Sequence, residues 1–216
     1  MPRAGGSNPG FRFLPGYFDR AAQVGLVGEL RTAVAESPFF TPAMPRTGKP
    51  FSVRMTNLGP LGWVSDRERG YRYQATHPVT GRPWPPIPGM ILDLWRSIAA
   101  YAHPPEACLV NYYAPTARMG LHQDSDEEDF SAPVVSISLG DSCLFRIGGR
   151  ARGGATSSLK LSSGDVVLLG GDARLAFHGV DRIHPGTSTL LSEWFPEGGR
   201  INLTLRRVSK PPEGPA

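Results

Sequence analysis

His122 and Asp124 form an H-x-D sequence, and a third candidate ligand, His178, lies further along the chain. Residues i and i+2 of an extended segment point to the same side, so His122 and Asp124 can reach one ion. His178 would then have to come from a neighbouring strand. Two imidazoles and one carboxylate on one face of a ferrous ion leave coordination positions open for a bidentate cosubstrate and dioxygen. The alternative is a chance H-x-D sequence with a structural histidine.

The segment from Arg200 to Arg206 alternates apolar and polar residues, which is the pattern of a half-buried strand. Its polar face would carry two arginines, an amide and a hydroxyl, namely Arg200, Asn202, Thr204 and Arg206. A guanidinium can bind a carboxylate through two parallel hydrogen bonds, so this face could hold a short dicarboxylate near the metal. For the strand alone, a charged face in solvent is the simpler interpretation. Together with the H-x-D…H pattern, the dicarboxylate is favoured.

The elements that must position these residues are mostly strands. The chain has 216 residues with 26 glycines and 22 prolines, which favours frequent turns and few long helices. Helices are expected at 20–36 and 92–101, and short strands near 51–57 and 71–74. Further strands are expected at 107–113, 133–139, 142–147, 157–161, 165–169, 175–177, 187–191 and 200–208. A run of strands without intervening helices predicts a mainly β fold with flanking helices, a double-sheet jelly roll.

Composition limits the class of protein. The two cysteines, Cys108 and Cys143, do not indicate a disulfide framework, and they fit a reducing cytoplasm. The sequence has no apolar run of signal-peptide or membrane-spanning length, so we expect a cytoplasmic protein that does not enter a membrane. The net charge of +4 and a pI near 9.3 are compatible with binding to polyanions but do not establish it.

The order of several motifs resembles the AlkB family of iron(II)/2-oxoglutarate dioxygenases. These are Asn111-Tyr112-Tyr113, His122-x-Asp124, His178, Arg200-x5-Arg206, Met55-Thr56-Asn57-Leu58-Gly59, Leu61-Gly62-Trp63 and Tyr71-Arg72-Tyr73. The similarity covers about residues 11–209. It implies a double-stranded β-helix of one catalytic domain, with a nucleotide-recognition lid over 38–90 and a jelly-roll core over 107–208. Residues 1–10 and 210–216 are expected to be flexible tails.

The resemblance implies Fe(II) as the metal, 2-oxoglutarate as cosubstrate and O2 as oxidant, with the ion held by His122, Asp124 and His178. It places 2-oxoglutarate against Asn111, Tyr113, Arg200, Asn202 and Arg206. Arg200 and Asn202 would meet the distal carboxylate together with the Tyr113 hydroxyl. Arg206 would lie nearer the metal and Asp124.

The resemblance further implies oxidative dealkylation of bases such as 1-methyladenine and 3-methylcytosine in DNA, with RNA as a second candidate, by a monomeric repair enzyme. Trp63 would lie against one face of the flipped base and the His122 ring against the other. Tyr71 and Met55 correspond to family positions around the same pocket. Asp126 could complement the cationic base, or it could be a solvated charge within the acidic run 124–129.

Other basic residues are ambiguous. Arg152 could contact the substrate, although a surface arginine in a glycine-rich loop is a comparable interpretation. The expected lid carries cations that could contact phosphates or simply be scattered on the surface: Arg46, Lys49, Arg67, Arg69 and Arg72.

Two other functions compete with base dealkylation. One is a 2-oxoglutarate-dependent hydroxylase or demethylase of a protein or small molecule, against which the aromatic and basic lid argues. The other is a jelly-roll binding module without metal, against which the complete triad and both arginines argue. The sequence departs from the family pattern by one extra residue between Trp63 and Tyr71, by Tyr112 in place of a basic residue and by Leu169 in place of tryptophan. These departures leave fine substrate preference open.

Overall fold

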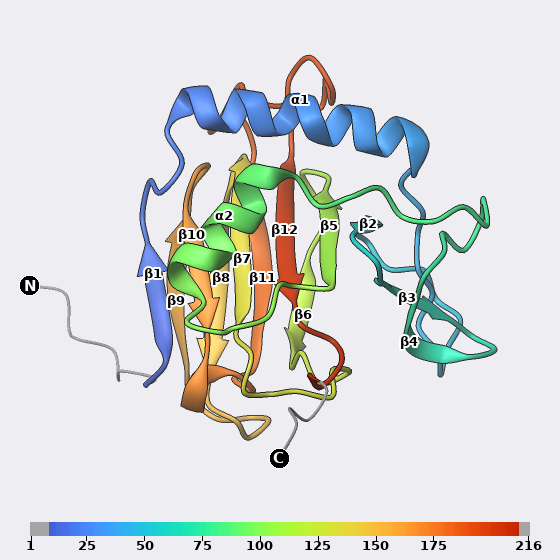
Figure 1. Cartoon of the computed structure of the whole chain (residues 1–216). Coiled ribbons are helices and arrows are strands. Elements are labelled where there is room, and N and C mark those ends of the chain that lie inside the picture. Colours follow the sequence, from blue (N-terminus) through green and yellow to red (C-terminus); the bar gives the residue numbers. More distant parts are fainter. Residues whose placement is uncertain (1–8, 212–216) are drawn as a thin grey trace, which may run out of the picture.

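Two antiparallel sheets lie against each other in the computed structural model, which describes residues 9–211 (Figure 1). The larger sheet has the order β1 (Phe11–Leu14), β10 (Val166–Leu169), β7 (Val134–Gly140), β12 (Arg200–Arg206), β5 (Ala107–Tyr113) and β2 (Arg54–Leu58). The smaller sheet has the order β6 (Met119–His122), β11 (His178–His184), β8 (Ser142–Gly148) and β9 (Thr156–Leu161). The predicted mainly β fold, a double-sheet jelly roll, is confirmed.

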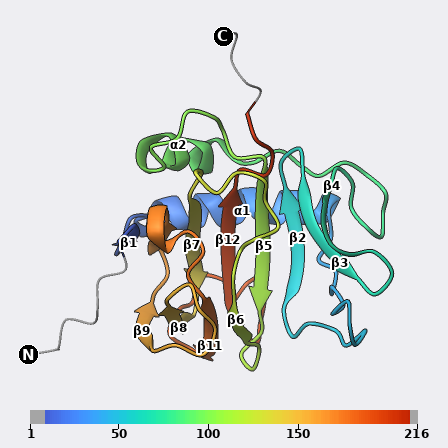
Figure 2. The same cartoon turned by 90° about the horizontal axis from the view of Figure 1, so that it is seen from below.

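Two helices complete the architecture on the larger sheet. Helix α1 (Arg20–Glu36) runs across one end of its strands, and α2 (Gly89–Ile98) lies on its outer face (Figures 1 and 2). The Asp19 side chain caps α1 by accepting a hydrogen bond from the Ala22 N–H. Apolar residues of both helices pack against β5, β7 and β12 in one core, including Leu26, Leu30, Ile91, Leu94 and Trp95. A short 3-10 helix, η1 (Gly171–Ala173), precedes β11.

Apolar and polar residues alternate along β12, and the two kinds face different layers of the protein. Ile201, Leu203 and Leu205 belong to the core under the helices. The polar residues of β12 point to the other side, between the sheets, yet all four are less than 9 % exposed. The interpretation of this face as a solvated surface is therefore wrong, because the smaller sheet covers it. A second core between the sheets contains Leu109, Tyr113, Phe145 and Val180.

Most expected elements are present, shifted by at most three residues, but some predictions were wrong. Residues 187–191 do not form a strand, because the Asp141 carboxylate accepts the main-chain N–H groups of Thr187 and Ser188 and holds a loop. Residues 175–177, where a strand was expected, lie just before β11 and are not part of it. The second helix covers 89–98 and not 92–101. Strands β1, β3 and β6 were not expected.

The segment expected to form the lid has two parts, one within the larger sheet and one in a separate hairpin. Strand β2 pairs with β5 and so belongs to the larger sheet, whereas β3 (Gly62–Asp66) and β4 (Gly70–Gln74) form a separate hairpin (Figure 2). The Asn57 side chain joins them through hydrogen bonds of 3.0 Å with the Trp63 N–H and carbonyl. Gly62 lies so close to the Trp84 ring that a Cβ atom would be 2.4 Å from it. The hairpin is thus fixed at its base.

Both cysteines are free and buried, as the composition indicated. Among residues 9–211, no helix has the length and apolar character needed to cross a membrane. The predicted tails fall almost entirely outside the described residues.

Candidate active site

His122, Asp124 and His178 come together at one end of the smaller sheet. His122 ends β6, His178 begins β11, and the two are direct partners in the antiparallel pair. One ligand atom from each of the three residues lies within 4.8 Å of the others. The two imidazole ring centres are 4.6 Å apart. Two nitrogens and one carboxylate oxygen at this spacing suit a single divalent ion with open coordination positions.

Main-chain carbonyls orient both imidazoles. Nδ1 of His122 lies 2.9 Å from the Gly120 carbonyl oxygen, and Nδ1 of His178 lies 3.0 Å from that of Ala176. Each Nδ1–H therefore donates to a carbonyl, which leaves Nε2 free to bind a metal. Burial lowers the pKa of His178 to about 4, so its ring is neutral near pH 7 and can offer a lone pair.

The buried Asp124 carboxylate is held by Arg206. The Arg206 Nη2 donates to Oδ1 at 2.7 Å, whereas Oδ2 has no hydrogen-bond partner within residues 9–211 and lies 3.7 Å from His178 Nε2. Burial alone would raise the pKa of Asp124, but the surrounding positive groups, among which Arg206 has the largest effect, together hold the pKa well below its usual range. The carboxylate is therefore ionised, with one oxygen directed to the ligand cluster.

Arg200 and Tyr113 continue the polar surface away from the triad. Arg200 is 1 % exposed, donates through Nη2 to Ser138 Oγ at 2.9 Å, and has its guanidinium carbon 5.4 Å from the centre of the Tyr113 ring. Within the described chain, Arg200 Nε and Nη1, Arg206 Nε and Asn111 Oδ1 are buried without a hydrogen-bond partner. Buried guanidinium nitrogens of this kind are costly unless a ligand accepts their hydrogen bonds. The surface therefore fits an anion that accepts hydrogen bonds from these nitrogens.

Asn202 lies on the same face, but its side chain already has partners. Its Nδ2 donates to Ser136 Oγ and the Ile137 carbonyl, and its Oδ1 accepts from Thr204. The predicted contact of Asn202 with a carboxylate would need these bonds to rearrange.

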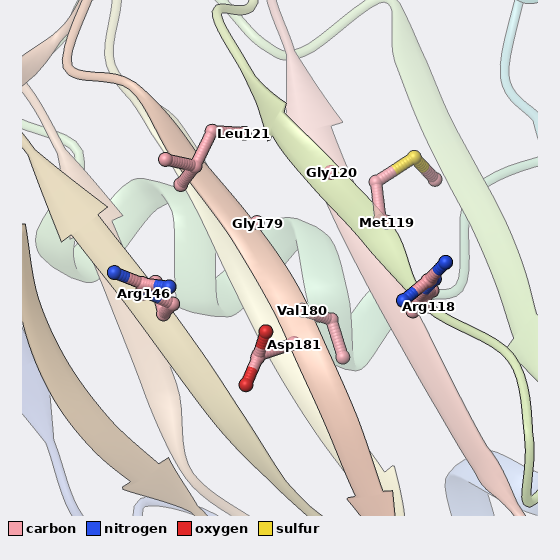
Figure 3. A pocket seen from close by; sticks show the side chains of 8 residues that line it. All are labelled: Arg118, Met119, Gly120, Leu121, Arg146, Gly179, Val180 and Asp181. Carbon is pink, nitrogen blue, oxygen red and sulfur yellow. The ribbon is translucent and has the colours of Figure 1, made fainter. Parts of the chain in front are cut away.

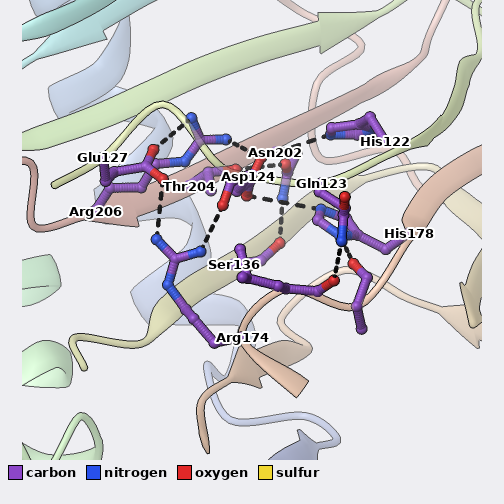
Figure 4. A network of polar contacts seen from close by, with 12 residues as sticks. His122, Gln123, Asp124, Glu127, Ser136, Arg174, His178, Asn202, Thr204 and Arg206 are labelled. Carbon is purple, nitrogen blue, oxygen red and sulfur yellow. Dashed lines mark hydrogen bonds and ion pairs between the residues drawn. The ribbon is translucent and has the colours of Figure 1, made fainter. Parts of the chain in front are cut away.

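A buried ion network behind Asp124 was missed by the sequence analysis (Figure 4). Glu127 accepts from Arg174 at 2.9 Å, lies 3.3 Å from Arg206, and accepts a short hydrogen bond from the Tyr73 hydroxyl. Burial raises the pKa of Tyr73, so its hydroxyl stays protonated. In the sequence, Glu127 is one acid in an acidic run, and nothing there distinguishes it from solvated neighbours.

The β3–β4 hairpin brings three of the predicted substrate residues together beside this network. The Trp63 indole N–H donates to Asp126 Oδ2 at 2.7 Å, and the Trp63 ring stacks on Tyr71 with centres 5.4 Å apart. Tyr71 is half exposed, whereas Trp63 is 8 % exposed. Since Asp126 follows the triad residue Asp124 by two residues, an aromatic pair lies at the edge of the triad.

The remaining predicted substrate residues differ in their surroundings. Met55 is buried in the core between the sheets, in the same cluster as Trp63. Arg152 is exposed on the loop between β8 and β9, and its guanidinium lies 4.9 Å from the centre of the Phe177 ring. The structure thus joins Met55 to the aromatic cluster and places Arg152 on a different loop.

A separate hollow of about 370 Å³ is lined by β6, β8 and β11 (Figure 3). Arg146, which lines it, lies on β8 between Phe145 and Ile147, and these two neighbours belong to the inner core, so the hollow lies on the outer face of the smaller sheet. The sheet therefore separates it from the space that Arg200 and Tyr113 line.

The geometry agrees with comparisons to known proteins. The model of the 2OG-Fe(II) oxygenase superfamily matches residues 10–206. An Alpha-ketoglutarate-dependent dioxygenase AlkB homolog of Caulobacter vibrioides is 56 % identical over 202 residues, covering 93 % of this chain and 88 % of that protein. The chain belongs to the AlkB family. It is accordingly a 2-oxoglutarate-dependent dioxygenase of the iron(II) class.

Other members of the AlkB family are similar along most of the chain. Alpha-ketoglutarate-dependent dioxygenase AlkB of Escherichia coli is 40 % identical, covering 89 % of this chain and 87 % of that protein. DNA N(6)-methyladenine demethylase ALKBH1C of Arabidopsis thaliana is 34 % identical, covering 92 % of this chain but 48 % of that longer protein. The solved structure of OsALKBH1 superposes with a TM-score of 0.75 at 33 % identity, covering 94 % and 99 % of the two chains.

Proposed function

We propose that this protein oxidatively removes alkyl groups from ring nitrogens of nucleic-acid bases, with 1-methyladenine and 3-methylcytosine in DNA as the primary substrates and RNA as a further one. The observation that carries the proposal is the hydrogen bond between Trp63 and Asp126, because it fixes an aromatic ring beside the triad residue Asp124. The AlkB family supplies the reaction class, and the name of the plant relative supports a nucleic-acid substrate.

Iron and 2-oxoglutarate, when bound with dioxygen, supply an oxidation that yields succinate and carbon dioxide and hydroxylates the N-alkyl carbon. For a methyl group, the resulting hydroxymethyl adduct breaks down to formaldehyde and the unmodified base. The protein's part is to hold the cosubstrate and base in register and to exclude water. His122, Asp124 and His178 would hold the metal.

The distal carboxylate of 2-oxoglutarate would meet Arg200, whose Nε and Nη1 are buried without a partner in the described chain. Arg206 would act indirectly, by holding Asp124 ionised and in place.

Arg200→Met should raise the Michaelis constant for 2-oxoglutarate by about ten- to a hundredfold, because a hydrogen bond to a charged group contributes about 1.5–3 kcal/mol. Methionine keeps most of the buried apolar volume. Steady-state succinate formation over a range of 2-oxoglutarate concentrations measures the effect. Arg200→Lys, which keeps the charge but loses the bidentate fork, should be intermediate. An unchanged Michaelis constant in both variants would place the cosubstrate elsewhere.

A methylated base is a suitable ligand for the aromatic pair. Methylation on the pairing edge makes 1-methyladenine and 3-methylcytosine cationic and prevents normal pairing, which lowers the cost of extruding them from a duplex. A Trp63 face would attract such a cation by stacking and cation–π attraction. Asp126 shares one oxygen with Trp63, and its other oxygen is left for an exocyclic amine.

Four cations would meet the phosphates next to that base. Arg46, Lys49, Arg67 and Arg69 are exposed, and no ion pair involves them within residues 9–211. A Cβ atom added to Gly48 would lie 3.4 Å from the Arg67 side chain, so the turn at 44–49 and the hairpin turn lie close together. Arg72 differs, because it pairs with Asp66 at 2.7 Å.

Removing Arg67 and Arg69 together should weaken binding of single-stranded DNA and reduce its salt dependence. The slope of log affinity against log salt should fall by about 0.7 for each phosphate that the protein no longer neutralises. Fluorescence anisotropy at several salt concentrations measures this slope. Arg31→Ala, at an exposed position of helix α1, is the control and should leave the slope unchanged. A parallel shift of both variants would assign the effect to net charge alone.

The decisive assay incubates the purified protein with Fe(II), ascorbate and 2-oxoglutarate plus oligonucleotides that contain 1-methyladenine or 3-methylcytosine. Mass spectrometry should show loss of one methyl group per lesion, with formaldehyde and succinate released. Unmethylated oligonucleotides are the control. If 2-oxoglutarate is consumed while every methylated DNA and RNA strand stays intact, a protein or small-molecule hydroxylase replaces this proposal.

A monomeric state and a cytoplasmic location stay predictions from the sequence.

A further inference from the structure

Arg174 connects the two segments that carry metal ligands. It follows η1 and precedes the ligand His178 by four residues, and its side chain is 3 % exposed. Its three guanidinium nitrogens reach three acceptors on the segment that starts at Asp124. These are the Asp124 carbonyl at 2.7 Å and Glu127 Oε2 at 2.9 Å (Figure 4), and the Ala132 carbonyl at 2.9 Å. One side chain of the His178 segment thus fixes both ends of the loop 124–132.

The contacts around Arg174 hold Asp124 at two atoms. Arg174 binds its main-chain oxygen, and Arg206 binds its carboxylate Oδ1. Glu127 joins the two arginines, since its Oε2 accepts from Arg174 and its Oε1 lies near Arg206. Two guanidinium charges are therefore balanced by two carboxylates in a buried group. Such a group is more useful for fixing geometry than for net stability, because desolvation offsets much of its attraction.

A further hydrogen bond joins the same two segments, but its donor lies on the Asp124 segment. The Gln123 side chain, from the middle of the H-x-D sequence, donates to the Leu175 carbonyl at 2.6 Å. The next carbonyl, that of Ala176, orients the His178 ring. Residues 174–178 therefore accept one hydrogen bond from the Asp124 segment and donate three to its main-chain and side-chain atoms.

We propose that Arg174 is a positioning residue of the iron site, which sets where the Asp124 carboxylate lies relative to His178. It acts through the loop 124–132 and touches neither metal nor substrate. The inference rests on the proposed iron site formed by His122, Asp124 and His178. A guanidinium suits this role because its three nitrogens, held in a fixed plane, reach three separate acceptors. The single ammonium nitrogen of lysine would keep the charge but not this geometry.

The test uses metal binding to the full chain without cosubstrate. Purified metal-free wild type, Arg174→Lys and Arg174→Met are titrated with Co(II), and both affinity and the Co(II) absorption spectrum are recorded. Changes in the surroundings of metal ligands typically cost ten- to a hundredfold in affinity. We expect at least a tenfold loss in both variants, with an altered spectrum because the carboxylate is no longer held. A role in overall stability would shift the unfolding temperature but leave the spectrum of the folded variant unchanged.

Arg146→Lys and Arg146→Met are the matched controls. Arg146 lies on β8 and its side chain donates to the Thr156 hydroxyl, so both should bind Co(II) as the wild type does. Wild-type affinity and spectrum in both Arg174 variants overturn the proposal. If wild-type protein itself shows no Co(II) binding that His178→Ala abolishes, the iron site fails and this proposal fails with it.

If the variants do not fold, hydrogen exchange in the wild-type protein tests the proposal. In the metal-free protein, the Arg174 Nε–H that donates to Ala132 should exchange slowly with solvent by NMR. The exposed Arg182 is the reference for fast exchange. Fast exchange at Arg174 would show that its fork is not held before metal binds and would overturn the proposal.

Discussion

His178→Ala and His122→Ala should each reduce 2-oxoglutarate-dependent succinate formation to background while the protein stays folded. Removing one of three ligands leaves a metal ion weakly and wrongly held. Each histidine lies 3.7 Å from the buried Asp124 carboxylate, but removing one histidine leaves Asp124 paired with Arg206. The Nδ1 contacts that would also be lost are to main-chain carbonyls. Succinate release with saturating Fe(II) measures the loss, and circular dichroism checks the fold.

His184→Ala is the control for the histidine variants, because His184 ends the same strand β11 on which His178 begins. It should retain full activity. Asp124→Ala should also be inactive, but it should cost about 3–5 kcal/mol of stability as well, since it leaves the buried Arg206 with one fewer carboxylate. Near-normal turnover in either histidine variant would remove that residue from the metal site.

Trp63→Ala should separate recognition of the base from the oxidation of 2-oxoglutarate. Stacking of a base on an aromatic side chain contributes about 1–3 kcal/mol, so repair of methylated oligonucleotides should fall by about 5- to 150-fold. Consumption of 2-oxoglutarate without nucleic acid should survive, because Trp63 contacts neither Arg200 nor the triad side chains in the hydrogen bonds of the described chain. Parallel measurement of demethylation and succinate gives the ratio directly.

Trp63→Phe distinguishes the two roles of the indole. It keeps a ring on Tyr71 but removes the N–H that donates to Asp126. Activity near the wild type in this variant, with a large loss in Trp63→Ala, would assign the effect to stacking. Wild-type repair in both variants would show that Trp63 is a packing residue of the hairpin. Other residues would then bind the base.

Local patterns predicted the strands whose two faces differ in polarity. β12 is the best example, because Ile201, Leu203 and Leu205 alternate strictly with polar residues. The same pattern could not show that its polar face is buried. Burial depends on the smaller sheet, whose pairing partners lie far apart in the chain.

β11 was missed for a local reason. The pairing register of β11 with β8 shifts between Val180 and Arg182, so Asp181 and Arg182 are both exposed and the alternation is interrupted. The apolar Leu190 and Leu191 suggested a strand at 187–191, and they do pack in the core, but from a loop. Apolar residues report burial more reliably than they report backbone conformation.

In the candidate site, residue type was informative only where the chemistry is unusual. An H-x-D sequence and paired arginines are uncommon enough to be noticed. Glu127 and Arg174 are ordinary charged residues in the sequence, and their role arises from burial beside Asp124. Such support for a site is created by tertiary structure, and one sequence does not reveal it.

Within residues 9–211, two guanidinium nitrogens of Arg200 are buried without a hydrogen-bond partner, so a ligand that accepts from them would stabilise the folded protein. A ligand present at a hundred times its dissociation constant stabilises the folded state by about 2.7 kcal/mol. The steady-state fraction of unfolded chains, and with it the exposure to proteases, would change by about a hundredfold over that range. If 2-oxoglutarate binds Arg200 as proposed, the abundance of the protein would therefore respond to the carbon metabolism that supplies this cosubstrate.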